Sequence, residues 1–235
     1  KESDAILAFI EQRVSGVILQ PTFSYEDPKY QEQLRKLLIR LQAPVVVVDR
    51  PLSRSVWDGV FFDGYLASYQ ATEALIKGQN KTIGIITGNL EMKLARERFE
   101  GYMQAMKDFH IPISEKFILK GDFTMETAYD LVKKCIQEDR LPDAMFTTNN
   151  FATIGFMKAV IESNLKIGLD IRCISFDYLD FTDILGLNLS YVGRCDNMGE
   201  LAGKMLMDRI ANPQLPRRTE VVQPRLILKG SEKKI

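Results

Sequence analysis

The stretch that decides the fold is residues 142–178, PDAMFTTNNFATIGFMKAVIESNLKIGLDIRCISFDY. Its pattern predicts a strand at 144–147, a helix at 151–163 with apolar residues at helical spacing, and a second strand at 171–176. A right-handed helical crossover brings the carboxyl ends of two parallel strands to the same edge of a sheet. Ligands of open α/β sheets bind at that edge. The stretch therefore offers two asparagines and one aspartate to a small polar ligand.

The same alternation of strand and helix runs through the rest of the chain. Further strands are expected at 14–20, 43–49, 57–62, 81–87, 116–120, 189–193, 219–222 and 225–228, and helices at 1–13, 26–42, 64–77, 91–110, 125–138 and 196–210. This order predicts the α/β class with parallel sheets flanked by helices. So many strands exceed one ordinary sheet, which favours two sheets in two lobes. Thr124 and Gly78 are expected as helix caps, and the tail 230–235 is expected to fray.

Composition and charge exclude several classes of function. Lysine plus arginine equals aspartate plus glutamate, 31 each, so bulk charge gives this segment no attraction to nucleic acid or anionic membranes. No apolar run is long enough to cross a bilayer, and no secretory leader is visible. Cys135, Cys173 and Cys195 have no metal-binding spacing, and reduced thiols fit a cytoplasmic protein.

The sequence also lacks the usual signatures of catalysis. It has no glycine-rich nucleotide loop, no GxSxG elbow and no HExxH. His110 is the single histidine, and nothing places it beside a nucleophile. Asp177, Asp180 and Asp183 have a spacing that could bind a cation, but it equally fits the solvated first turn of a short helix. We expect no catalytic residue, no cofactor and no metal site.

One arginine is the strongest candidate for a ligand-binding side chain. Arg98 lies about two turns into a helix that follows a strand, so it faces the carboxyl edge of the sheet. Gly101, one turn later, permits close helix packing. A guanidinium at this position could donate a fork of hydrogen bonds to ligand hydroxyls or to a carboxylate.

The remaining candidates stand where strands end. Asp49, Asn149 and Asp177 each follow an apolar strand, and the alternative for each is a solvated strand end or a helix N-cap; Asn150 is a good N-cap candidate. Phe62 and Phe123 are apolar residues at loop starts, where a core role is the alternative. Together these residues indicate a cleft for a polar ligand.

Several runs of residues, taken in order, are similar to one known family. They are VSGVIL (14–19), APVVVVDR (43–50), GQNKTIGIITG (78–88), RFEGY (98–102), PDAMFTTNNFATIG (142–155), DIRCISFDY (170–178) and PRLILKGS (224–231). This pattern resembles the effector-binding core of the LacI–GalR family of bacterial transcription regulators, whose fold is similar to periplasmic sugar-binding proteins. Gln79, Asn150, Ser175 and Tyr178 depart from the residues usual in that family.

The resemblance implies two lobes joined by three hinge crossovers. The N-terminal lobe is expected to be 1–62 plus 195–223, and the C-terminal lobe 63–194 plus 224–235. The family's effector contacts map onto Arg98, Asn149, Asp177, Asp49 and Phe62, with Phe123 where purine-binding members place an aromatic residue. Met92 stands where those members have an arginine, so the resemblance favours a sugar or sugar derivative in the cleft between the lobes.

The resemblance also implies partners. The family's core opens with a strand, a helix and a second strand before the region that matches Lys1, preceded by a helix-turn-helix, so we expect the 235 residues to be part of a longer polypeptide. Operator DNA would be bound only through that upstream domain. No leucine-heptad helix follows Lys229, which favours a homodimer over a tetramer. The alternative function is that of a sugar-binding protein of a transporter. A third possible function is that of an enzyme with this fold.

Overall fold

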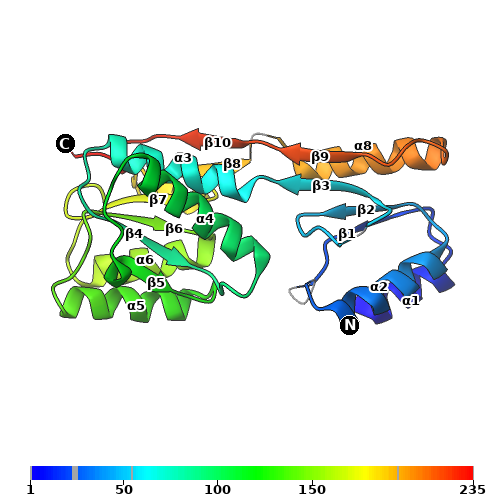
Figure 1. The fold of residues 1–235 in the computed structure, drawn as a ribbon, viewed down its shortest axis with the longest axis horizontal. Helices are drawn as coiled ribbons and strands as arrows, with labels where there is room; N and C mark the ends of the chain where they lie inside the picture. The colour runs from blue at the N-terminus through cyan, green and yellow to red at the C-terminus, as the bar shows by residue number, and fades with distance from the viewer. Residues whose placement is uncertain (1, 23–25, 54, 195, 235) are drawn as a thin grey trace. The chain divides into compact units, whose positions relative to one another are not determined.

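The computed structural model describes residues 2–22, 26–53, 55–194 and 196–234, so the predictions for Lys1, Cys195 and Ile235 lie outside the described residues. The chain divides into two compact α/β units. We call Lys1–Phe62 with Cys195–Gln223 the first unit, and Asp63–Arg194 with Pro224–Ile235 the second unit. The chain therefore passes from one unit to the other three times, after residues 62, 194 and 223. Figure 1 labels the helices and strands of both units.

The first unit is a parallel sheet with helices on both faces. Its strands, in the order β1-β2-β3-β9, are Val17–Leu19, Val45–Val48, Asp58–Phe62 and Thr219–Val222, and its helices are α1 (Glu2–Glu11), α2 (Pro28–Leu41) and α8 (Met198–Ala211). Neighbouring side chains of a strand point to opposite faces. Val45 and Val47 accordingly pack with α1 and α2, whereas Val46 packs with α8. The valine run is buried on both faces, as a covered parallel strand requires.

The second unit has a larger sheet, with the strand order β10-β8-β7-β6-β4-β5. The strands are β4 (Ile83–Thr87), β5 (Ile118–Lys120), β6 (Ala144–Thr147), β7 (Arg172–Phe176), β8 (Ser190–Arg194) and β10 (Pro224–Ile227); the helices are α3 (Gly64–Lys77), α4 (Lys93–Asp108), α5 (Met125–Gln137), α6 (Asn150–Glu162) and the short α7 (Asp180–Ile184), with a 3₁₀ turn at Glu115–Phe117. All strand pairs are parallel except β8 with β10. The pairs α3–α4 and α5–α6 cover the two faces (Figure 1). The α/β prediction is confirmed.

Two helical glycines let the helices of each pair approach closely. A Cβ added to Gly101 of α4 would lie 2.2 Å from the carbonyl oxygen of Tyr65 in α3. A Cβ added to Gly155 of α6 would lie equally close to the carbonyl oxygen of Met125 in α5. The prediction that Gly101 permits close packing is confirmed, and this packing fixes where α4 presents its side chains.

The predicted caps are confirmed, but the predicted fraying of the tail is wrong. The Thr124 hydroxyl accepts a hydrogen bond from the Thr127 amide at the start of α5, and Gly78 is the C-cap of α3. The φ angle of Gly78 is −70°, so glycine is not required there for a left-handed backbone. It is required for space, because a Cβ at this position would lie 2.3 Å from the carbonyl oxygen of Glu232. Ser231 and Glu232 are each only 5% exposed, because the tail crosses the amino ends of β7 and β8 and bonds to them.

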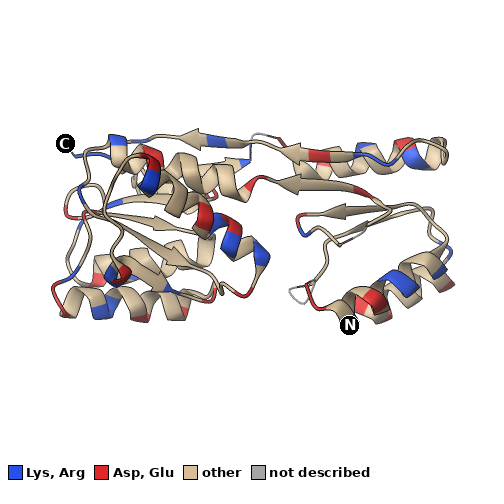
Figure 2. Cartoon of the chain, viewed as in Figure 1, with Lys and Arg blue, Asp and Glu red and all other residues tan. Residues whose placement is uncertain are grey.

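Charged residues of both signs are interspersed along the helices of each unit (Figure 2). The chain has equal numbers of basic and acidic residues, 31 of each, so its formal net charge is zero. Within the described part of the chain, every helix is too short or too polar to cross a membrane.

Candidate functional site

The carboxyl edge of the second unit's sheet collects four of the predicted side chains. Phe123 follows β5 after two intervening residues, Asn149 stands two residues past β6, and Asp177 follows β7 directly. Because β4 to β7 are parallel, these strand ends meet at one edge. Arg98, from the second turn of α4, is buried among them.

Arg98 is the centre of this group of side chains. Its guanidinium carbon lies 3.7 Å from the centroid of the Phe176 ring and 5.8 Å from that of Phe123. Its Nη1 donates a hydrogen bond to the carbonyl oxygen of Thr148. The side chain is 5% exposed, and stacking on an aromatic face suits a weakly hydrated guanidinium. These contacts hold the planar fork in one orientation.

Asn149 is fixed by hydrogen bonds at both ends of its amide. Its Oδ1 accepts from the backbone amide of Ala152, 3.0 Å away, and its Nδ2 donates to the carbonyl oxygen of Phe123, 2.9 Å away. Asn149 is therefore the N-cap of α6, and the prediction that Asn150 takes that role is wrong, because Asn150 is already the first helical residue. The amide ties the ends of β5 and β6 together.

Asp177 is held in place by its backbone and by an ion pair. Its amide donates to the carbonyl oxygen of Val192, and its own carbonyl accepts from the hydroxyl of Ser175. Arg194 Nη1 lies 2.9 Å from Asp177 Oδ1. Both side chains are about 30% exposed, so the ion pair is in contact with solvent.

Phe123 lies against a glycine that leaves room for its ring. A Cβ on Gly88, just after β4, would come within 2.1 Å of the ring's Cζ and within 2.4 Å of two further ring atoms. Gly88 is buried, so the ring covers the end of β4. The result is a half-buried aromatic face beside the guanidinium of Arg98.

Three of the predicted residues have left-handed backbones. The φ angles of Asp49, Phe123 and Asp177 are 65°, 71° and 70°. This region is uncommon outside glycine, and for a bulky residue it costs on the order of 1–3 kcal/mol. Such conformations concentrate at ligand sites, where the surrounding structure holds them. At each of these three positions the left-handed conformation turns the backbone sharply soon after a strand ends.

Asp49 and Phe62 belong to the first unit. Asp49 directly follows β2, and its Oδ2 accepts a hydrogen bond from Nε2 of Gln20 at 2.9 Å. Phe62 is the last residue of β3 and packs, half-buried, against the hydrophobic cluster beneath α8. Both stand at the carboxyl edge of the first unit's sheet.

Three residues of the second unit escaped the sequence analysis. They are Phe176, which stacks on Arg98, Gly88, which accommodates the ring of Phe123, and Arg194, which pairs with Asp177. A charged residue at the end of an apolar strand was the only available signal for Arg194. The contacts of Phe176 and Gly88 depend on strand order, which the sequence does not show.

The other two aspartates considered for a cation have different surroundings. Asp183 accepts hydrogen bonds from Lys229 and Tyr178, and these bonds lower the pKa of its carboxyl group. Asp180 accepts a bond from the next backbone amide at the start of α7. Among the residues that the structure describes, no three histidine, cysteine, aspartate or glutamate side chains form a metal-binding group.

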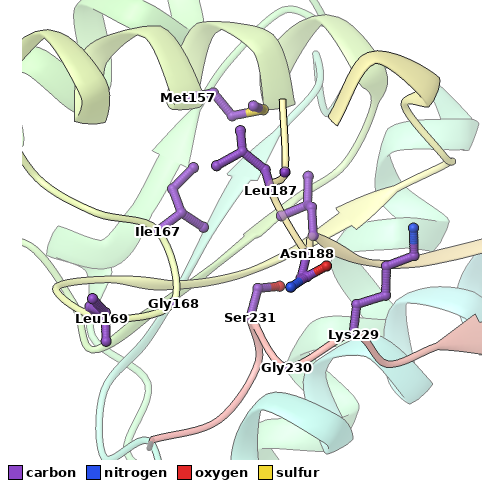
Figure 3. Close-up of a pocket in the computed structure, with 11 residues that line it drawn as sticks. Met157, Ile167, Gly168, Leu169, Leu187, Asn188, Lys229, Gly230 and Ser231 are labelled. Atoms are coloured by element: carbon purple, nitrogen blue, oxygen red, sulfur yellow. The ribbon is translucent and has the colours of Figure 1, made fainter. Parts of the chain in front are cut away.

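A pocket of about 250 Å³ lies at the opposite, amino edge of the second unit's sheet (Figure 3). Apolar side chains such as Met157, Ile167 and Leu187 line one part of it, and Asn188 and Ser231 line another. These residues precede β7 and β8 or follow β10. The pocket is thus separate from the predicted residues.

Two α/β units linked by three crossovers, with polar side chains at the carboxyl edges of their sheets, define a periplasmic-binding-protein-like ligand-binding core. A family model described as a periplasmic binding protein-like domain matches residues 72–231. The chain belongs to this family. The predicted resemblance to the effector-binding core of the LacI–GalR family is confirmed by the relatives that follow.

The relatives include two repressors. The chain is 30% identical over 235 residues to the transcriptional repressor PurR of Photorhabdus laumondii, covering 97% of this chain and 66% of that protein. It is 27% identical to the ribose operon repressor of Haemophilus influenzae, covering 94% of this chain and 65% of that protein. The chain therefore spans just under two-thirds of the length of these curated relatives.

A solved structure shows the same fold. The LacI family regulator of Enterococcus faecium, crystallised with bound ribose, superposes with a TM-score of 0.86 at 20% identity, over 99% of this chain and 84% of that one.

Proposed function

We propose that the chain is the effector-sensing core of a LacI–GalR-type transcription regulator. A small sugar or sugar derivative binds in the cleft between the lobes, and its binding controls an upstream helix-turn-helix that recognises operator DNA. The observation that carries the proposal is the arrangement of Arg98, Phe123, Asn149 and Asp177 along one edge. Phe123 contacts both Arg98 and Asn149, and Asp177 is paired with Arg194. The repressor names of the two relatives favour a regulator over a transport protein.

The chemistry of the side chains favours a polyhydroxylated ligand. The fork of Arg98 donates to hydroxyl oxygens, and the carboxylate of Asp177 accepts from hydroxyl groups. The ring of Phe123 offers a flat apolar face for a sugar ring. Asp49 and Phe62 of the first unit complete the set of contacts in this proposal. The Enterococcus faecium regulator holds ribose, which supports a pentose as the first ligand to test.

Asn149 has a different part in this scheme. Both ends of its amide bond within the second unit, so its principal task is to position Phe123 and the start of α6. One lone pair on Oδ1 and one N–H of Nδ2 are left for a ligand hydroxyl. Met92, which precedes α4, brings no positive charge to the edge, and this supports a sugar over a purine.

The regulator works as a cytoplasmic homodimer in this proposal. Ligand binding shifts the population between two dimer states that space the upstream DNA-binding heads differently. Exposed Ile184 and Leu185 at the end of α7, 84% and 63% accessible, are apolar side chains of the kind that a partner subunit would cover.

Calorimetric titration of ribose, followed by other pentoses, hexoses and their phosphates, tests the proposal. Asp177→Asn should weaken binding of the sugar about 10- to 100-fold, since a hydrogen bond to a charged group contributes about 1.5–3 kcal/mol. Arg98→Ala should abolish detectable binding, and Arg98→Lys, which keeps the charge without the fork, should weaken it strongly.

Arg96→Ala is the matched control. Arg96 lies on the same helix, two residues earlier, and donates to the carbonyl oxygens of Leu90 and Glu91, which are not among the four site residues. Its replacement should leave the affinity within about twofold. Unchanged affinity in Arg98→Ala, or an equal loss in Arg96→Ala, would reject this site.

A further inference from the structure

The ion pair between Asp177 and Arg194 joins the site edge to the boundary of the second unit. Asp177 directly follows β7, and Arg194 is both the last residue of β8 and the last residue of the second unit before the chain crosses to the first. Arg194 Nη1 lies 2.9 Å from Asp177 Oδ1. A carboxylate that is available to a ligand thus contacts a crossover residue directly.

The register of β8 with β10 brings a second crossover to the same point. Arg194 stands opposite Pro224, the residue with which the chain re-enters the second unit. Two of the three crossovers therefore lie side by side at Arg194. The amide of Asp177 also donates to the carbonyl oxygen of Val192, so both its backbone and its side chain bond to β8.

We propose that Arg194 is a positioning residue of the ligand site. It orients the carboxylate of Asp177, and it transmits the binding of a ligand at Asp177 to the two crossovers at Arg194 and Pro224. This inference rests on the proposed function of the edge as a ligand site. A ligand hydroxyl that bonds to Asp177 Oδ1 competes with the guanidinium for that oxygen, which loosens the end of the β8–β10 ladder. A ligand can shift a conformational equilibrium only through such a difference in contacts between states.

Hydrogen exchange without any ligand tests the coupling. In the free protein, backbone amides of 190–194 and 225–227 report opening of the ladder. Asp177→Asn keeps the shape and tolerates the left-handed backbone but removes the charge. Because a partly exposed ion pair contributes modestly, exchange at the ladder end should accelerate about two- to fivefold. Arg194→Gln should act alike, and the double variant should add nothing beyond the larger single effect.

Two further variants separate positioning from general weakening. Arg194→Lys keeps a cation within reach of Asp177 and should restore exchange to within about twofold of the wild-type rate. Asp183→Asn breaks an ion pair of the same unit, with Lys229 beyond the far end of β10, and should leave the crossover end unchanged.

Unchanged exchange in Asp177→Asn, additive effects in the double variant, or equal acceleration in Asp183→Asn would overturn the inference. Since the measurement needs no sugar, a failure to bind ribose would count against the proposed function and leave this result standing.

Discussion

Replacement of Gly88 by alanine should damage the aromatic face of the site more than any other single added methyl group there. The new Cβ would lie 2.1–2.4 Å from three atoms of the Phe123 ring, whereas ordinary contacts begin at 3.4 Å. The ring must therefore retreat by more than about 1 Å. Its backbone is already left-handed, with φ 71°, and its carbonyl is bonded to Asn149, so the adjustment has little room.

The expected cost of Gly88→Ala is about 1–3 kcal/mol of unfolding free energy, the usual range for overpacking a close contact. Urea denaturation measures this cost, and ribose titration measures the accompanying loss of affinity. Adding Phe123→Ala removes the atoms that clash, so the double variant should lose less stability than the sum of the two single variants.

Gly203→Ala is the matched control for this substitution. Gly203 lies within α8, and a Cβ there would have no atom within 4 Å. An alanine in a helix interior should raise stability by about 0.5–1 kcal/mol. A Gly88→Ala protein as stable as the wild type, with unchanged ligand affinity, would refute the placement of the Phe123 ring.

Three further substitutions test the contacts that hold each unit together. Arg209→Met should destabilise the first unit by about 3–5 kcal/mol in a urea titration, since it leaves the buried carboxylate of Asp58 without the guanidinium that bonds to both its oxygens. Burial raises the pKa of Asp58, but the bonds and charges of Arg209 and Arg218 together outweigh burial and lower that pKa below its ordinary value of 3.8. This contribution is therefore present above that pH and is lost in more acidic solution, so Asp58→Asn should flatten the acid limb of the stability profile. Gly78→Ala should cost about 1–3 kcal/mol despite its ordinary φ, because its methyl group would meet the carbonyl of Glu232, and thermal unfolding checks this.

Local sequence was sufficient for the elements that carry the site. Short continuous apolar runs predicted the strands, and the position of Asn149 and Asp177 at strand ends followed from those runs. Gly101 could be recognised because close helix packing needs a small residue at a fixed helical position. The choice between Asn149 and Asn150 as the cap was beyond this reasoning, since both amides suit the role and one residue of register decides between them.

The sequence by itself determined the α/β alternation, the family and the residue types that stand at the strand ends, because these depend on near neighbours and on short motifs. Only the tertiary structure decided that Arg194 pairs with Asp177, that Phe176 stacks on Arg98, and that the tail around Glu232 is buried. The physical reason is that each of these contacts joins residues far apart in the chain. Strand order and register bring such residues together, and neither can be read from the local pattern of apolar and polar residues.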